Sequence, residues 1–152
     1  PEDFVAQSGM AFAATLACIA FSSCGASLTQ AIQNALSCTF QTRDGVGSGI
    51  VLPAVMQFWA ETRQSRLAQI AGFLELDGTG QTQESEMALS AIQWVREVQD
   101  HIGLPTGLTA AGVNPEDVAA LAATAVSSQN LIDLSPLTAT VDDLIRILKT
   151  CF

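Results

Sequence analysis

Apolar positions along the chain recur with the three-to-four-residue period of a helix, and short polar or glycine-rich stretches separate them. In the second apolar segment, Leu28, Ile32 and Leu36 fall on one helical face. No segment alternates apolar and polar residues with the period of two that a half-buried strand shows. The pattern predicts helices over residues 3–22, 27–39, 50–59, 63–76, 84–102, 114–127 and from Thr138 or Thr140 onwards. We therefore expect an all-α fold, a compact multi-helix bundle, with residues 1–152 forming a single helical domain.

The first predicted helix is apolar or small at nearly every position between Gly9 and Phe21. This run of 13 residues is too short to span a bilayer. The acidic residues Glu2 and Asp3 precede it, where a signal peptide carries basic residues. We interpret the segment as a fully buried central helix with other helices around it, and we expect no association with a membrane.

Two segments carry sequence signals for the start of a helix. Asn114 is followed by Pro115, which suits the first position of a helix, and Asp143 lies three residues after Thr140, the spacing of a capping box. The loop over residues 42–49 is rich in glycine, but no strand precedes it and no P-loop lysine follows it. We therefore expect its glycines to allow a tight turn at a helix start, and not to bind phosphate.

Charged residues make up only 14% of the chain, against about 25% in an ordinary soluble domain. Either some apolar surface faces another chain or a ligand, or a core rich in alanine raises the apolar content. The first alternative favours a homo-oligomer. The net charge is −9, and the six cationic residues are scattered along the chain. Such a charge distribution excludes binding to nucleic acid.

The cysteines and the single histidine show no catalytic pattern. The four cysteines form no CxxC pair and have no histidine nearby, so we predict no zinc site and buried free thiols of a cytoplasmic protein. They are Cys18, Cys24, Cys38 and Cys151. His101 falls at the end of a predicted helix, where the helix dipole favours a cation. We expect the large aromatic side chains of Phe58, Trp59 and Trp94 to lie in the core.

The order of these elements resembles the C-terminal helical domain of iron-dependent (group III) alcohol dehydrogenases. Four stretches carry the resemblance: FSSCG at the end of the first helix, LTQAIQNALSCTFQTRDGVGSGIVLPAVMQF, IGLPTGLTAAGVNPEDVAALA and SPLTATVDDLIRIL. The third and fourth stretches are similar to the family's endings "LGLP…LGV…ED" and "PLT…IL". The resemblance covers most of the chain and implies the family's helical fold.

The same resemblance implies that the family's histidines have been replaced. In the family, the second stretch carries three histidines, of which the first and last bind the metal and the middle one lies at the substrate. The matching positions here are Gln30, Asn34 and Asp44, at unchanged spacing. An amide and one carboxylate are a poor ligand set for a divalent transition metal. The family's nucleotide-binding domain has no counterpart in these 152 residues. We therefore expect neither a metal nor a cofactor.

Without the family's other domain, we expect its cleft to stay open as a candidate pocket for an apolar small molecule. We expect Asp44 to be the catalytic residue, as a general acid or base, and Gln30, Asn34 and Phe40 to contact the substrate. A cofactor-independent cyclase or isomerase of secondary metabolism suits such a pocket. Three alternatives stay open. The polar residues are simply surface replacements, the chain is a non-catalytic interaction subunit that docks a partner through the cleft face, or it is half of a split dehydrogenase.

Overall fold

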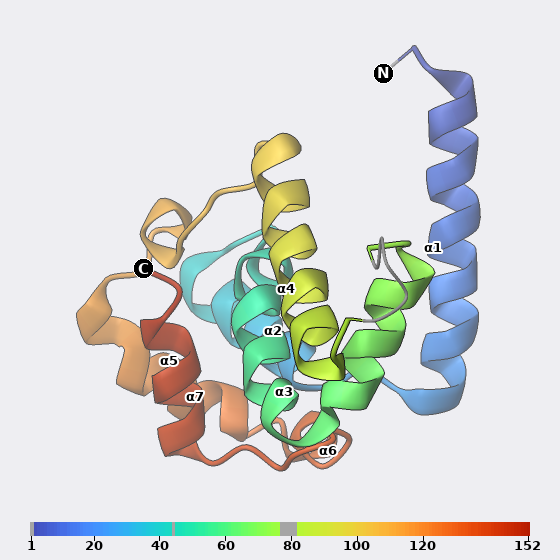
Figure 1. The fold of residues 1–152 in the computed structure, drawn as a ribbon. Helices are drawn as coiled ribbons and strands as arrows, with labels where there is room; N and C mark the ends of the chain where they lie inside the picture. Colours follow the sequence, from blue (N-terminus) through green and yellow to red (C-terminus); the bar gives the residue numbers. More distant parts are fainter. Residues whose placement is uncertain (1, 44, 77–81) are drawn as a thin grey trace.

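The computed structural model describes residues 2–43, 45–76 and 82–152. In this part of the chain, seven α-helices and two short 3-10 helices form, without any strand (Figure 1). The all-α, multi-helix fold expected from the apolar period is therefore confirmed. The helices are α1 (Phe4–Cys24), α2 (Leu28–Phe40), α3 (Val46–Phe73), α4 (Glu84–His101), η1 (Leu108–Ala111), η2 (Pro115–Asp117), α5 (Val118–Val126), α6 (Gln129–Ile132) and α7 (Val141–Lys149).

The main core surrounds α2, which packs against the first half of α3 and against α5. The predicted apolar face of α2 is the buried one, because Leu28, Ile32 and Leu36 are fully inaccessible to solvent. Helix α7 covers the opposite side of α5 and adds Leu144 and Leu148 to the same cluster. This cluster fixes the position of α2, on which three of the four predicted site residues lie.

A second, smaller cluster joins the C-terminal half of α3 to α4. The predicted helices over 50–59 and 63–76 form one element, α3, but the backbone of Arg63 is not helical (φ −130°, ψ 31°). The two halves of α3 therefore point in different directions. The second half packs against α4 through residues that include Leu67, Ala71 and Ile92. We call the C-terminal half of α3 together with α4 the α3–α4 hairpin.

The caps and Gly45 follow the sequence signals, whereas Gly47 and Gly49, expected in a loop, lie inside α3. Asn114 is the N-cap at the predicted helix start before α5, where Asp117 completes a capping box, and Thr140 and Asp143 close the predicted capping box at α7. Gly45 is the N-cap of α3 with φ +85°, a conformation that glycine adopts without strain. The short elements η1 and α6 were not predicted, because segments of four residues are too short to show a helical period.

Helix α1 corrects the prediction of a buried central helix. Although it forms where the sequence indicates, none of its residues is buried, and it stands apart from the other helices in Figure 1. The apolar pattern correctly identified a helix that lacks a polar face, but no other part of the described chain covers it. At 21 residues the helix is also longer than the apolar run, and its length and mean hydropathy of 1.7 suffice to cross a membrane. Core helices of folded domains have the same properties.

Two further expectations about burial are wrong. All four cysteines are free, but only Cys151 is buried. Cys18 and Cys24 lie on the uncovered α1, and Cys38 lies on the exposed side of α2. Phe58 is buried as expected and Trp59 is half-buried, but Trp94 projects from α4 with 36% of its surface exposed. In each wrong case the apolar side chain lies on a face that has no covering element in the described structure.

Candidate functional site

The structure brings together two of the predicted site residues. Gln30 and Asn34 lie one turn apart on α2, and the Nε2 of Gln30 donates a hydrogen bond to the Oδ1 of Asn34 at 2.8 Å. Gln30 is half-buried and Asn34 is exposed. Because each amide uses the other as its partner, this pair forms a hydrogen-bonded surface feature of α2.

The other two predicted residues lie apart from this pair or outside the described part of the chain. Phe40 is the last residue of α2, where it is half-buried and packs against the main core. Its position therefore gives it a structural role. Asp44, the expected catalytic residue, is not among the described residues. The roles proposed for these side chains remain predictions.

Gln33 is a buried polar residue that the sequence reasoning missed. It is 2% exposed, and its Oε1 accepts a hydrogen bond of 2.8 Å from the backbone N–H of Ser48. Its Nε2 donates to the Oγ of Ser37 and to the carbonyl oxygen of Arg43. Gln33 thus connects α2 to Arg43, in the segment before α3, and to Ser48, in the first turn of α3. One signal for it was available, because its helical position lies next to the apolar face of α2.

A larger hollow lies elsewhere, between the two halves of α3. We call it the α3 groove, and it has a volume of about 560 Å³. Its apolar lining comes from both halves of α3 and from α4, and Pro136 closes one side. The apolar residues of α3 and α4 that line it are Leu52, Met56, Trp59, Leu67, Ile70 and Val95. The change of direction at Arg63 creates the groove, because a straight α3 would not present its two halves to one another.

The polar groups of the α3 groove are cationic or already bonded. The indole Nε1 of Trp59 donates to the Oγ of Ser135 at 3.0 Å, so this ring is held in a fixed orientation. Arg63 and Arg66 lie at the edge, where Arg63 donates a hydrogen bond to the Thr62 carbonyl and Arg66 donates one to the Gln69 side chain. Within the described residues, neither guanidinium pairs with a carboxylate. The groove therefore combines an apolar interior with a positively charged edge.

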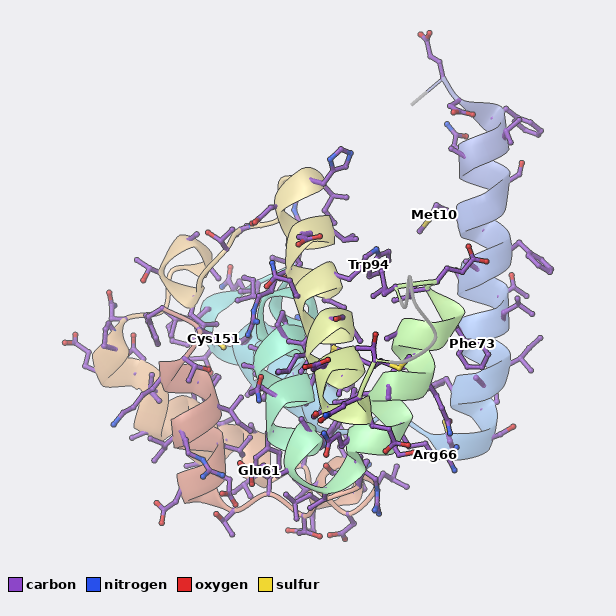
Figure 2. All side chains as sticks on the ribbon, viewed as in Figure 1. Met10, Glu61, Arg66, Phe73, Trp94 and Cys151 are labelled. Carbon is purple, nitrogen blue, oxygen red and sulfur yellow. The ribbon has the colours of Figure 1, made fainter. Side chains whose placement is uncertain are left out.

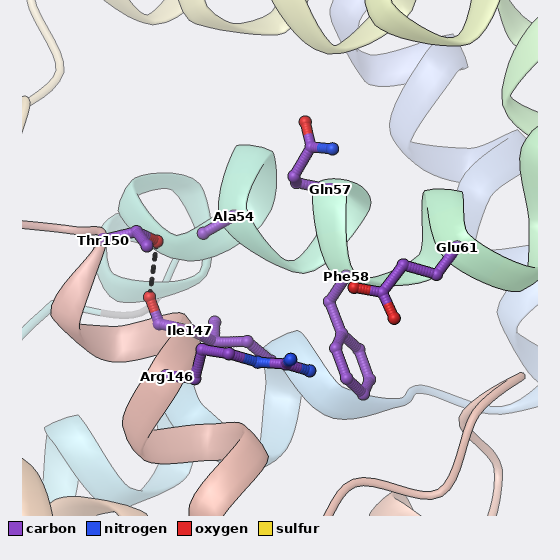
Figure 3. Close-up of a pocket in the computed structure, with 7 residues that line it drawn as sticks. All are labelled: Ala54, Gln57, Phe58, Glu61, Arg146, Ile147 and Thr150. Carbon is purple, nitrogen blue, oxygen red and sulfur yellow. Dashed lines mark hydrogen bonds between the residues drawn. The ribbon is translucent and has the colours of Figure 1, made fainter. Parts of the chain in front are cut away.

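Figure 3 shows a smaller pocket, of about 230 Å³, between α3 and α7. The guanidinium of Arg146 lies 5.7 Å from the centre of the Phe58 ring, and Asp143 pairs with the same guanidinium at 3.1 Å. The Oγ1 of Thr150 donates to the carbonyl oxygen of Ile147. Since Arg146 is already held by an aromatic ring and a carboxylate, this pocket is best explained as the contact between two helices.

A family model named "Fe-containing alcohol dehydrogenase family, C-terminal" matches residues 1–152. The chain belongs to this family. Among its relatives is the NAD-dependent methanol dehydrogenase of Bacillus methanolicus, 29% identical over 97% of this chain and 38% of that protein. The lactaldehyde reductase of Escherichia coli strain K12 is 28% identical over 94% of this chain and 37% of its own length. The chain thus spans little more than a third of these family members.

Solved structures of the family share the fold. A crystal structure of 1,3-propanediol oxidoreductase superimposes with a TM-score of 0.76 at 22% identity, covering 84% of this chain and 33% of that protein. The alcohol dehydrogenase from Oenococcus oeni gives the same TM-score at 20% identity, over 83% of this chain and 32% of the other. The resemblance noted in the four sequence stretches is therefore confirmed at the level of family and fold.

Gln30, at one of the family's metal positions, is a poor ligand for a divalent transition metal. The other metal position, Asp44, lies outside the described residues, and the Gln30 amide nitrogen points at the Asn34 oxygen, 2.8 Å away. Amide oxygens are weak ligands beside the imidazoles and carboxylates that iron and zinc prefer. In the described residues, no three histidine, cysteine, aspartate or glutamate side chains come together in a group suited to a metal. We therefore derive no chemical step that involves a metal.

Proposed function

We propose that this chain is a metal-free, non-redox member of the family, and that it binds an apolar small molecule with an anionic end in the α3 groove. The observation that carries the proposal is the α3 groove itself, whose volume of about 560 Å³ lies within the range of small-molecule sites. Its apolar lining favours a hydrocarbon body. Among the described residues the guanidinium groups of Arg63 and Arg66 have no carboxylate partner, which favours a carboxylate of the ligand at the edge.

The proposal is limited to binding. Among the described side chains that line the α3 groove, there is no carboxylate, histidine or thiol to exchange a proton with a bound molecule at neutral pH. A cyclase or isomerase reaction would need such a group, or a fixed hydrogen-bond donor at the reacting atom. Trp59 does not supply that donor, because its N–H is already bonded to Ser135. The groove residues therefore support a carrier or sensor of an apolar acid.

The relatives are named for methanol, lactaldehyde and 1,3-propanediol, which are small polar molecules. A groove lined by leucine, methionine, isoleucine and tryptophan side chains does not satisfy the hydrogen bonds of such compounds. We therefore propose a ligand of a different class from the compounds after which the relatives are named.

Dodecanoate and dodecanol test the proposal, because they share a hydrocarbon chain and differ in charge. Binding is followed by the fluorescence of Trp59, with Trp94→Phe as background so that one tryptophan remains. We expect both compounds to bind, and Ile70→Glu, which places a carboxylate in the lining, to weaken both. Arg66→Gln should weaken only dodecanoate, by about two- to five-fold, the range for one exposed ionic contact.

Arg96→Gln is the matched control, since Arg96 lies away from the α3 groove and should leave both affinities unchanged. Absence of binding by either compound contradicts the proposal, and so does binding that Ile70→Glu does not affect. If Arg66→Gln lowers the affinities for dodecanoate and dodecanol equally, the result contradicts only the proposal that the ligand has an anionic end.

A second function, the docking of another protein chain, rests on a different observation. Helix α1 exposes large apolar side chains along its whole length, and the α3 groove plays no part in this surface. We therefore also propose that α1 is an interaction element. Its partner is argued below.

A further inference from the structure

Helix α1 carries the longest uncovered apolar surface of the described chain. Half of the exposed large apolar side chains of the described residues lie on it. They are Phe4, Val5, Met10, Phe12, Leu16, Ile19 and Phe21. No residue between Phe4 and Gly25 is charged, so no part of the helix surface requires water around an ion. Exposed apolar surfaces of this size mark a contact with another molecule.

A second uncovered apolar surface lies on the α3–α4 hairpin. Phe73, at the end of α3, is 86% exposed, and Leu89 and Trp94 on α4 are 53% and 36% exposed. Leu89 and Trp94 also line a hollow of about 400 Å³, together with Leu76 and the polar residues Ser90, Gln93 and Glu97. We call Phe73, Leu76, Leu89 and Trp94 the hairpin face. In Figure 2, Phe73 and Trp94 project from the hairpin on the side nearer α1.

The two surfaces occur on the same chain without covering one another. Met10 projects from α1 toward the hairpin in Figure 2, yet 70% of its surface is exposed. The C-terminal end of α1 is held close to α2, because only residues 25–27 separate the helices and Leu28 is fully buried. At Gly25 (φ +73°) a Cβ atom would lie 2.6 Å from the Cδ1 of Leu134, so the backbone approaches its neighbour closely there. The short connection over residues 25–27 therefore fixes where α1 leaves the main core, and in this position α1 leaves its own hairpin face uncovered.

We propose that α1 of one copy packs against the hairpin face of a second copy, and that the second copy returns the same contact, which gives a two-fold dimer. This inference rests on the interaction role proposed for α1 and is independent of the α3 groove. A second copy is the favoured occupant because each chain carries both halves of the contact. One reciprocal pair covers both surfaces on both chains, the self-complementary arrangement of a two-fold interface.

Charge and area both support a second copy. Two chains of net charge −9 repel one another, so a contact between them needs a surface without acidic groups, and α1 from Phe4 onward is such a surface. A helix of 21 residues is about 31 Å long and about 10 Å wide. Each contact buries half of the side surface of the helix and an equal area of the hairpin face. The two reciprocal contacts of the dimer together remove about 2,000 Å² from water. Stable interfaces bury about 1,200–2,000 Å².

The first measurement is the mass of the full chain in solution by light scattering. We expect twice the chain mass of 15.9 kDa. Leu16→Lys on α1 and Phe73→Lys on the hairpin face should each shift the protein toward the monomer. Both positions are exposed in the single chain, so neither change should lower the thermal midpoint of the monomer. Ile102→Lys is the matched control, because Ile102 is equally apolar and 65% exposed but lies on neither surface.

The decisive test is to mix the two variants. A Leu16→Lys chain keeps its hairpin face, and a Phe73→Lys chain keeps its α1, so one sound contact forms between them. We expect a histidine-tagged Leu16→Lys chain to retain the untagged Phe73→Lys chain on a nickel column, and not an untagged Leu16→Lys chain. Retention of neither would indicate that α1 pairs with another α1, which overturns the proposal.

Two other results overturn it. A wild-type mass of 15.9 kDa at micromolar concentration would show that α1 is covered by its own chain or by a different partner. Sedimentation of the wild type, but not of Leu16→Lys, with phosphatidylcholine vesicles would show that α1 inserts into a bilayer. The α3 groove remains testable with dodecanoate in either case, so the two proposals can fail separately.

Discussion

The Oε1 of Gln33 accepts a hydrogen bond of 2.8 Å from the backbone N–H of Ser48, which joins the middle of α2 to the first turn of α3. The first N–H groups of a helix have no partner within that helix. Ser48 lies in the first turn of α3, where its N–H is such a group, and a side chain from the preceding helix satisfies it. Gln33 therefore acts as a cap supplied from another element.

We expect Gln33→Leu to lower the free energy of unfolding by about 1–3 kcal/mol, because it leaves the Ser48 N–H without its partner. The measurement is urea unfolding followed by circular dichroism. Asn34→Leu, at the exposed neighbouring position, is the control and should change stability by less than about 0.5 kcal/mol. Equal stability of Gln33→Leu and the wild type would show that water replaces the bond.

Gly47 should not tolerate a side chain. A Cβ atom built there lies 2.6 Å from the Cδ1 of Leu36 and 2.8 Å from the Oε1 of Gln33. We expect Gly47→Ala to destabilise the fold by about 1–3 kcal/mol through overpacking, measured as a lower thermal midpoint. Gly9→Ala is the matched control, since Gly9 is also helical and has no atom within 4 Å of the added group. A wild-type midpoint for Gly47→Ala would mean that α2 and α3 separate without cost.

Stability should depend on pH through Asp143. Hydrogen bonds from the backbone and side chain of Thr140 lower the pKa of this carboxyl, and the Arg146 guanidinium lowers it further, while burial opposes them. A lowered folded-state pKa means that the stabilisation is complete above the ordinary value of about 3.9 and is lost as the pH falls through the lowered pKa. We expect Asp143→Asn to be less stable than the wild type at pH 7 and the difference to shrink on acidification. Asp142→Asn is the control for the change in net charge.

The loss of the α7 cap can be measured separately. The Asp143 N–H donates to the Oγ1 of Thr140 at 3.2 Å. Thr140→Ala removes this acceptor and should cost about 0.5–2 kcal/mol at pH 7, as measured by urea unfolding. Thr140→Ser keeps the hydroxyl and should restore most of the stability, and a variant that fails to do so would assign the effect to the methyl group.

The purified protein should contain no stoichiometric iron or zinc, because the amides of Gln30 and Asn34 are bonded to each other and bind such metals weakly. Elemental analysis after gel filtration is the measurement. The double change Gln30→His and Asn34→His restores imidazoles at two of the family's three histidine positions. It should raise the amount of metal that the protein retains. About one equivalent of chelator-sensitive metal in the wild type would contradict the expectation.

Much of the fold follows from local signals in the sequence. The apolar face of α2 and the caps at Asn114 and Thr140 depend on residues a few positions apart, and the structure has them where the sequence indicates. The pairing of Gln30 with Asn34 follows from one helical turn. The exposure of α1 could not be predicted in the same way. Apolar residues indicate that a surface is to be covered, but they do not indicate what covers it.

The α3 groove also could not be read from the sequence. It depends on the non-helical backbone of Arg63, and no proline or glycine marks that position. Most of the residues that line it fall in the helices predicted over 50–59, 63–76 and 84–102, and Trp59 was expected in the core. Their apolar character was correctly interpreted, but the angle between the halves of α3 decides which of them remain accessible. The second half of α3 packs against the next helix, α4, and a local sequence pattern does not specify such a contact between helices.

The break at Arg63 also has a consequence for local unfolding. The main core and the α3–α4 cluster are joined through α3, and the helical hydrogen bonds are interrupted where the two meet. Native-state hydrogen exchange should therefore show two cooperative units. The backbone amides around Ile92 should exchange through an opening of the hairpin alone. The amides around Ile32 should exchange only when the whole molecule unfolds.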